Sequence, residues 1–271
     1  MRSAEIALRI CVFQSRAIAE NFTMRLLLLS DIHANKFGLE AVLAHAQGAY
    51  DQVLCLGDVV GYGAHPNECC EILRDSRAWC LRGNHDAAAI NQLSIADFND
   101  IASAAMIWTR NQLSVTNISW LESLHSSLDR EADNFQAVHG SLRDPLEEYI
   151  VDIRIARYSI ARMSRGVCFF GHTHVAQWYS QPAEQQTAPM KTDDFLRGGQ
   201  KTLDATERYL VNPGSCGQPR DGNPQARYAL FDTLSRALEV RAIGYPIDAA
   251  RAAILSAGLP QELGDRLLAG E

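Results

Sequence analysis

Short apolar runs alternate with amphipathic stretches along this chain, and the alternation predicts an α/β protein. Arg25–Ser30 contains four consecutive leucines, which is typical of a fully buried strand, and Gln52–Leu56 and Ala78–Leu81 are further short apolar runs. Between these runs, Phe37–Ala46 and Asn67–Arg74 have the apolar spacing of helices. Strands that alternate with helices predict βαβ units and a largely parallel sheet.

The rest of the chain continues this pattern around a long polar stretch. Apolar spacing predicts helices at Ile101–Leu113, Ile118–Leu124, Val151–Met163, Pro246–Leu255 and Gln261–Leu268, and strands at Phe135–Val138, Val167–Phe170, Tyr209–Val211, Arg227–Phe231 and Leu238–Ala242. The polar stretch Ser180–Thr206 predicts a long loop or a hairpin extension at about residues 180–207. Because no internal repeat is visible, we expect residues 24–271 to form a single domain.

Residues 1–23 do not fit this pattern and are expected to be an N-terminal extension. Three arginines recur in it every seven residues, but it lacks the long apolar region and the cleavage site of a secretory signal. Two glutamates argue against a transit peptide. Two interpretations stay open: the segment is a loosely docked amphipathic helix, or translation begins at Met24 and the segment does not belong to the natural protein.

Composition and charge exclude several classes of protein. Of the 271 residues, 47% are hydrophobic, which is enough for a proper core, and the apolar runs fall far short of the ~20 residues needed to cross a bilayer. The net charge of −7 offers no basic excess for the phosphates of a nucleic acid. Seven cysteines without a CxxC pair argue against a disulfide framework and against a thiolate zinc site. We therefore expect a cytoplasmic protein with neither membrane nor nucleic acid as a partner, while a homo-oligomer stays open.

Side chains that bind metal ions follow five of the predicted strands. In chain order these are Asp31 and His33, then Asp58, then Asn84 and His85, then His139, and finally His172 and His174. Because sites in open α/β sheets form just beyond the carboxyl ends of strands, we expect these residues to converge on one site.

The types of ligand narrow the choice of metal. Carboxylate and amide oxygens mixed with imidazoles suit Mn²⁺, Fe or Zn²⁺. Two Asp, one Asn and four of the five His already exceed what one catalytic ion would take while keeping a position open. Two divalent ions that share one carboxylate and a bridging hydroxide account for the number, and such a pair, roughly 3.5–4 Å apart, can clamp a phosphate ester.

Each of these residues also has a purely structural explanation. A histidine at a strand end is usually hydrogen-bonded structure, and Asp31 or Asp58 could cap the N-terminus of a helix. A Gly-Asn pair is usually a turn. Five ordered matches at strand ends, however, argue for a common chemical function.

The ordered motifs resemble those of the calcineurin-like metallophosphoesterases. They are Asp31-Ile32-His33, Gly57-Asp58, Gly83-Asn84-His85-Asp86, His139 and Gly171-His172-Thr173-His174. The resemblance extends from Met24 to about Ala242, and the segments 57–63, 212–215 and 218–220 resemble a compact prokaryotic branch of small phosphoesterases. It implies a four-layer α/β/β/α sandwich with two mixed central sheets.

The resemblance also implies a role for each site residue. It assigns Asp31, His33 and His174 to the first metal ion, Asn84, His139 and His172 to the second, and Asp58 to both. His85 would then face the substrate as a general acid or a hydrogen-bond donor, and Asn84 could direct an amide N–H at the phosphate. Asp86 either orients the loop or caps the following helix.

Two further residues are weaker candidates for binding substrate. Tyr62 could stack on a base or bond a phosphate through its hydroxyl, although core packing is the favoured explanation. Arg220 lies in a loop rich in Gly and Pro and could form two hydrogen bonds with a phosphate, or it could be a solvated loop arginine.

The implied activity is dimetal-dependent hydrolysis of small phosphate esters by attack of a metal-bridging hydroxide. The substrate would be a phosphodiester or a nucleotide or dinucleoside polyphosphate, and manganese is the expected metal, with iron or zinc as alternatives. A serine/threonine-type protein phosphatase is a second hypothesis, which a panel of phosphopeptides and nucleotides would decide. A non-catalytic scaffold, such as the retromer subunit of this fold, is a third, but it would favour degraded ligand positions and none is degraded here.

Removal of residues 1–23 should leave activity and solubility nearly unchanged. Every motif and the first predicted strand follow Met24, and termini are usually the least constrained part of a domain. The truncated and full-length proteins should be compared for soluble yield and turnover. If the truncated protein is insoluble or inactive, the segment is instead a docked helix or part of an oligomer contact.

Overall fold

A computed structural model of the protein describes residues 23–185 and 187–271. The predicted N-terminal extension, residues 1–23, therefore lies outside the described residues except for Thr23. At the start of the described chain, the backbone N–H of Met24 donates a hydrogen bond to the hydroxyl of Thr233 over 3.1 Å.

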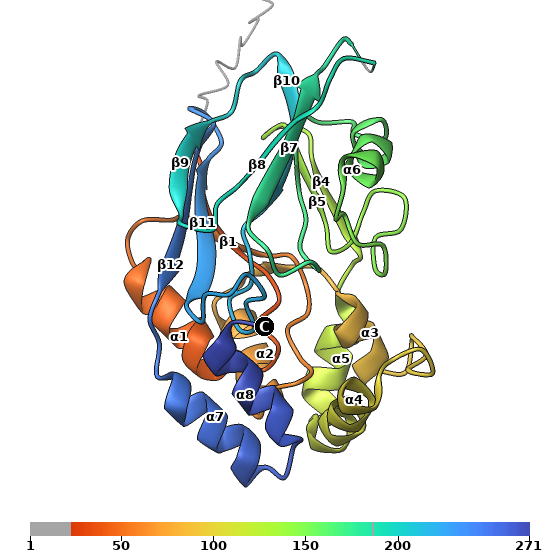
Figure 1. Ribbon diagram of the computed structural model, residues 1–271, viewed down its shortest axis with the longest axis vertical. Coiled ribbons are helices and arrows are strands. Elements are labelled where there is room, and N and C mark those ends of the chain that lie inside the picture. The colour runs from red at the N-terminus through yellow and green to blue at the C-terminus, as the bar shows by residue number, and fades with distance from the viewer. Residues whose placement is uncertain (1–22, 186) are drawn as a thin grey trace, which may run out of the picture.

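The described residues form two mixed β-sheets of six strands each, which confirms the predicted fold class (Figure 1). The first sheet has the order β3 (Trp79–Cys80), β2 (Gln52–Cys55), β1 (Arg25–Leu29), β11 (Ala226–Asp232), β12 (Ala237–Ile243) and β9 (Gly199–Thr202). The second has the order β4 (Ser127–Arg130), β5 (Phe135–Val138), β6 (Val167–Phe169), β10 (Glu207–Asn212), β7 (Gln177–Pro182) and β8 (Lys191–Asp194). Strands β1, β2 and β3 are parallel, as are β5, β6 and β10, so each sheet directs several carboxyl ends to one edge.

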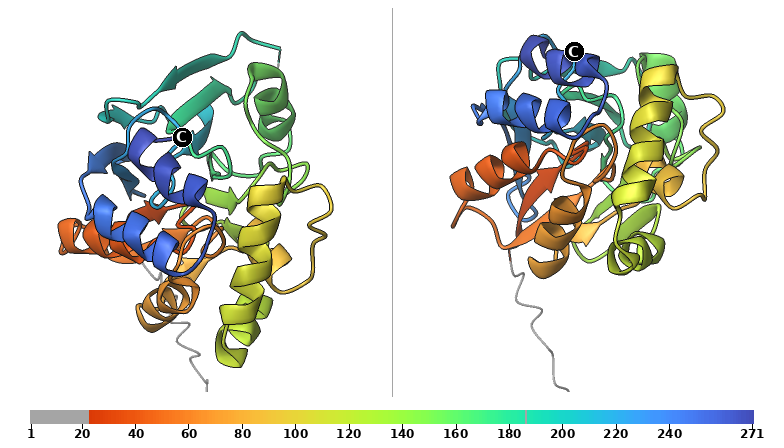
Figure 2. Two further views of the ribbon diagram at one scale, coloured as in Figure 1. Left: turned by 60° about the horizontal axis from the view of Figure 1, so that its bottom comes forward. Right: turned by 90° about the horizontal axis from the view of Figure 1, so that it is seen from below.

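Helices cover the outer faces of the two sheets. Those of the described chain are α1 (Lys36–His45), α2 (Pro66–Asp75), α3 (Asn84–Ala89), α4 (Asp100–Gln112), α5 (Val115–Ser123), α6 (Ile153–Ile160), α7 (Ile247–Ser256) and α8 (Gln261–Ala269). None of them is long and apolar enough to span a membrane. Figure 2 shows α7 and α8 as a pair of antiparallel helices beside α1, at the same end of the molecule as α4.

The alternating side chains of β1 explain the layers. Leu26 and Leu28 point into the core between the two sheets, where they join Phe135 and other residues of the second sheet. Leu27 and Leu29 point the opposite way, into the core beneath α1 and α2. A third core separates the second sheet from α6. The four leucines are all buried because this strand lies between two apolar layers.

Several strands carry too little apolar pattern to be predicted. The polar stretch 180–206 contains the end of β7, the exposed strand β8, and β9, which pairs with β12 in the other sheet. Strand β4 has the sequence SLDR and pairs only with β5. All but β7 lie at sheet edges, where polar side chains are favoured because they discourage pairing with other chains.

A buried ion pair fastens the loop between β10 and β11. Arg227 and Asp221 are both fully buried and form a salt bridge. The guanidinium of Arg227 also donates to the backbone oxygen of Phe195 over 3.1 Å and to that of Leu196 over 2.5 Å. The loop is therefore held against the segment that joins β8 to β9.

Arg227→Met should destabilise the fold by about 3–5 kcal/mol, because it leaves the buried Asp221 carboxylate unpaired. The free energy of unfolding from urea titration measures the loss. Arg251→Gln is the control: Arg251 pairs with Asp265 at a partly exposed site, where a salt bridge contributes about 1 kcal/mol or less. Equal losses of unfolding free energy in the two variants would contradict the larger contribution expected of the buried pair.

Candidate active site

The residues predicted from the motifs meet between the carboxyl ends of the two sheets. Asp31 and His33 follow β1, Asp58 follows β2, Asn84 and His85 begin α3, His139 follows β5, and His172 and His174 follow β6. All eight side chains are buried, with residue exposures of at most 8%. The structure thus brings together residues as far apart in sequence as Asp31 and His174.

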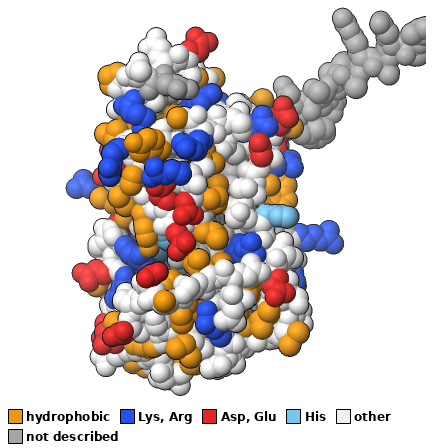
Figure 3. All heavy atoms as spheres, turned by 90° about the vertical axis from the view of Figure 1, so that its right-hand side faces the viewer, with side chains coloured by type: hydrophobic (Ala, Val, Ile, Leu, Met, Phe, Trp, Pro, Cys, Tyr) orange, Lys and Arg blue, Asp and Glu red, His pale blue; other side chains and the backbone are white. Residues whose placement is uncertain are grey.

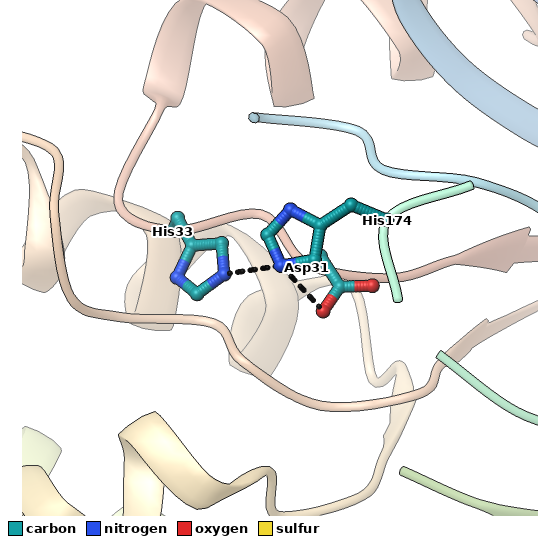
Figure 4. A group of neighbouring side chains, drawn as sticks. All are labelled: Asp31, His33 and His174. Atoms are coloured by element: carbon teal, nitrogen blue, oxygen red, sulfur yellow. Dashed lines mark hydrogen bonds and ion pairs between the residues drawn. The ribbon is translucent and has the colours of Figure 1, made fainter. Parts of the chain in front are cut away.

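One group of ligand atoms consists of Asp31, His33 and His174 (Figure 4). The Nε2 atom of His174 lies 3.2 Å from Nε2 of His33 and 3.4 Å from Oδ1 of Asp31. The three side chains come from both sheets and point toward one another. They match the first ligand set that the sequence resemblance implied.

A second group surrounds His139. Its Nε2 atom lies 3.1 Å from Nδ1 of His172 and 3.2 Å from Oδ1 of Asn84. These are the residues that the resemblance assigned to the second ion. Each imidazole can bind a metal ion through a ring nitrogen that carries no proton, and the amide can bind through its oxygen.

Asp58 connects the two groups. Its Oδ2 atom lies 3.6 Å from Nε2 of His33 and 3.4 Å from Nε2 of His139. Its other oxygen, Oδ1, accepts a hydrogen bond of 2.9 Å from the backbone N–H of His85 at the start of α3. One carboxylate oxygen therefore faces both sets of ligands while the second fixes the side chain.

Backbone carbonyl groups orient the four histidines. The ring nitrogen remote from the cluster lies 3.2 Å from the oxygen of Val60 in His33, 2.9 Å from Leu56 in His139, 3.2 Å from Glu147 in His172 and 2.6 Å from Gln218 in His174. When that nitrogen carries the proton, the other nitrogen presents a lone pair to the cluster. Each ring is thereby held in the tautomer that a metal ion requires.

The cluster has the donor set of a cation site. Burial holds the pKa values of His33 and His174 well below the usual range, so both rings are neutral. No proton then lies between their two Nε2 atoms, and each presents a lone pair. Burial raises the pKa of Asp31 to about 6. Burial also lowers the pKa of His139, but the charge and hydrogen bond of Asp58 outweigh this effect and raise it to about 9. The buried carboxylates thus attract positive charge, and the residues present fit divalent metal ions.

The backbone at these ligands is strained. Asp31, His33, Asp58, His172 and His174 all have positive φ angles, between 48° and 67°. This left-handed conformation costs about 1–2 kcal/mol for a residue other than glycine, and such residues cluster at functional sites. The rest of the fold holds the ligands in this conformation.

Asp86 performs both of the roles considered for it. One carboxylate oxygen accepts hydrogen bonds from the N–H groups of Val59 and Val60 over 2.9 and 3.1 Å, and the other accepts one of 3.0 Å from Gly83. Asp86 therefore caps α3 and ties it to the loop that carries Asp58. Since Asp58 also bonds the start of α3, the two loops form one unit.

His85 lies beside the cluster in an aromatic environment. The centroid of its ring lies 4.5 Å from the ring centroid of Tyr62, 4.8 Å from that of His33 and 5.1 Å from that of Phe98. A Cβ atom at Gly61 would lie 2.6 Å from Nδ1 of His85, and the φ of 91° also favours glycine there. Burial lowers the pKa of His85 to about 4, and a neutral imidazole still carries one N–H group to donate. Because His85, His33 and Asp58 could also hold an ion together, the structure keeps a ligand role open.

The two weaker candidates lie at the same site. Tyr62 is buried and its ring is 4.8 Å from that of His33, so it packs in the core and borders the ligands at once. Arg220 donates from Nη2 to Oε1 of Gln218 over 2.9 Å, and Gln218 is the residue whose carbonyl orients His174. Arg220 is therefore connected to the ligand cluster.

Tyr149 is a site residue that sequence reasoning missed. Its ring stacks on that of His172, with centroids 3.6 Å apart and an angle of 22° between the planes. It remains 43% exposed, so it borders the cluster on the solvent side. No motif includes it, because it lies in the irregular segment before α6 and only the fold brings it to His172.

Comparison with known proteins agrees with this arrangement. Residues 24–236 match the Calcineurin-like phosphoesterase superfamily domain. An uncharacterized protein of Methanocaldococcus jannaschii is 33% identical over 245 residues, which are 90% of this chain and 97% of that protein.

Two crystal structures resemble the chain over nearly its whole length. A metallophosphoesterase from Sphaerobacter thermophilus is 38% identical, with a TM-score of 0.82 over 92% of this chain and 100% of that chain. A hypothetical protein from Pyrococcus horikoshii is 18% identical and has a TM-score of 0.73 over 91% of this chain and 98% of that chain, a likeness of fold.

Asp58→Asn should reduce metal binding more than any other single ligand change. Asp58 is the carboxylate whose oxygen faces both groups of side chains, so, if each group holds an ion as the sequence resemblance implies, both ions would lose affinity at once. Elemental analysis of the purified variant measures the ions per chain. Asp51→Asn is the control, because Asp51 is exposed and pairs with Arg25 away from the site. A variant at position 58 that keeps two ions per chain would contradict the bridging role.

Proposed function

Because the chain belongs to the calcineurin-like phosphoesterase superfamily and is a phosphoric ester hydrolase, we propose that it hydrolyses small phosphate esters with the help of two divalent metal ions. The observation that carries this proposal is the position of Asp58 Oδ2, which faces His33 on one side and His139 on the other. The substrates we favour are phosphodiesters and nucleotide or dinucleoside polyphosphates.

The ligand set determines which metal we propose. Asp31, His33 and His174 would hold one ion, Asn84, His139 and His172 the other, and Asp58 both. Four imidazoles favour manganese, with iron or zinc as alternatives, over magnesium, which prefers oxygen ligands. The chemistry that two divalent ions would supply there is a hydroxide nucleophile at neutral pH and positive charge beside the oxygens of a phosphate group.

The chain's own residues then position the substrate and its leaving group. His85 directs a ring N–H at the leaving oxygen, as a hydrogen-bond donor in its neutral form or as a general acid when the ring is protonated. The amide oxygen of Asn84 would bind a metal ion, and its amide nitrogen keeps an N–H group that can donate to a phosphate oxygen. Arg220 supplies a fixed positive charge beside the cluster, which stabilises the negative charge of the phosphate.

The remaining alternatives find less support in the structure. A non-catalytic scaffold would not need seven oriented ligands, four of which have their ring tautomers fixed by carbonyl groups. A nucleic acid substrate would need a basic surface, whereas acidic and basic side chains are interspersed on the face shown in Figure 3. We propose the cytoplasm as the compartment, since the six cysteines of the described chain are all unpaired.

Chelation should abolish activity, and Mn²⁺ should restore it better than Mg²⁺. The assay uses protein dialysed against EDTA, then against buffer, and titrated with each ion in turn. A panel of monoester, diester, dinucleoside polyphosphate and phosphopeptide substrates decides the substrate class and tests the protein-phosphatase alternative. Full activity after exhaustive chelation would overturn the proposed metal dependence.

His85→Ala should lower turnover by about 10²–10⁴-fold while both ions stay bound, because the lost group acts on the leaving oxygen. The loss should be larger for an alkyl ester than for nitrophenyl phosphate, whose leaving group hardly needs a proton. His45→Ala is the control, since His45 bonds the hydroxyl of Tyr228 outside the cluster.

The same variant separates three roles for His85. Equal losses with both esters would show that His85 stabilises charge on the phosphate and does not protonate the leaving oxygen. Loss of an ion, measured by elemental analysis, would make His85 a ligand and reject the assignment.

A further inference from the structure

The C-terminal helix places a second arginine beside the loop that carries Arg220. Helices α7 and α8 lie beyond residues 24–236, the part of the chain that matches the family domain. The backbone N–H of Gly222 donates to the oxygen of Gly270 over 3.0 Å, so the end of α8 is joined to this loop. Arg266 lies one helical turn before Gly270, and Figure 1 shows the C-terminus ending against the loops near the carboxyl edge of the first sheet.

The residues before and after Arg220 hold its loop in place through contacts of their own. Asp221, the next residue, is locked in the buried ion pair with Arg227. On the preceding side, Gln218 binds the Arg220 guanidinium through its side chain and the ring of His174 through its carbonyl oxygen. Arg220 therefore has a defined position relative to the metal ligands.

The two arginines have donors that no acidic side chain uses. Neither Arg220 nor Arg266 forms a salt bridge with an acidic side chain in residues 23–185 and 187–271. The Nε atom of Arg220 is buried and has no hydrogen-bond partner there, and Nε of Arg266 donates to the backbone oxygen of Glu271 over 3.0 Å. Both residues are partly buried, so their charges are less screened than those of a solvated arginine.

The hydrogen bond between Gly222 and Gly270 brings the end of α8 to the Arg220 loop, and the charges of the two arginines act on each other and on Tyr62. Burial lowers the pKa of Arg266, and the positive charge of Arg220 lowers it further. Burial raises the pKa of the Tyr62 hydroxyl, while both arginines oppose this shift. Glu271 at the end of the chain offsets part of the charge of Arg266. The remaining repulsion between two like charges held close together is relieved when an anion binds between them.

We propose that Arg220, Arg266 and Tyr62 form a second anion site, next to the metal centre, that binds a further phosphate group of the substrate. The inference rests on the proposed hydrolysis at the metal centre and narrows its substrates to compounds with two or more linked phosphates, such as nucleoside diphosphates, triphosphates and dinucleoside polyphosphates. Guanidinium groups suit this task because they donate paired hydrogen bonds to phosphate oxygens. The helix α8, outside the family domain, would then determine specificity.

The test compares the binding of inorganic pyrophosphate and inorganic phosphate to the full-length, metal-loaded protein by calorimetry. Pyrophosphate spans both sites, whereas phosphate needs only one. Arg266→Gln should lower the ratio of the pyrophosphate affinity to the phosphate affinity by about tenfold or more, the usual effect of a hydrogen bond to a charged group. Arg266→Lys, which keeps the charge without the paired geometry, should restore part of the ratio.

Arg251→Gln is the matched control, because it removes a charge from the same pair of helices at the Asp265 salt bridge. Its affinity ratio should equal that of the wild type. An unchanged ratio in Arg266→Gln, or an equal fall in Arg251→Gln, would overturn the second anion site. Hydrolysis of the ester panel is measured in parallel: if the wild type cleaves none of the esters but the affinity ratio falls in Arg266→Gln as expected, the proposed function fails and the anion site stands.

Discussion

The buried carboxylate of Asp58 is the constraint on which the rest of the site depends. Its Oδ2 atom faces His33 and His139, while its Oδ1 atom accepts the backbone N–H of His85. A buried negative charge is costly unless positive charge compensates it, and the imidazole nitrogens around Asp58 present protons or lone pairs to the same small volume. The arrangement is therefore stable only around protons or cations, which is why the cluster could hold metal ions.

The fold supplies this arrangement through its two sheets. Parallel strands bring their carboxyl ends to one edge, and the loops that follow β1, β2, β5 and β6 each place a ligand there. Positive φ angles at five of the proposed ligands are strained, and surrounding hydrogen bonds stabilise this conformation. Among them are the three that the Asp86 carboxylate accepts from backbone N–H groups. The packing of several loops against one another, and not any single helix or strand, therefore positions these side chains.

The sequence predicts the α/β class, most buried elements and the ligand motifs, because apolar spacing and chemically distinctive side chains are local signals. It does not predict β4, β8 or β9, since edge strands are polar and their pairing depends on distant partners. For the same reason Tyr149 and Arg266 have no sequence signal: their proximity to His172 and to the Arg220 loop arises only when α6, α8 and the strand ends pack. The left-handed backbone at the ligands is likewise set by tertiary contacts that no local propensity reveals.

Anomalous diffraction from crystals grown with Mn²⁺ tests the central claim most directly. The account predicts two peaks in each molecule, one among Asp31, His33 and His174 and the other among Asn84, His139 and His172, with Asp58 Oδ2 in contact with both. A single peak, or two peaks of which one does not touch Asp58, would contradict the account.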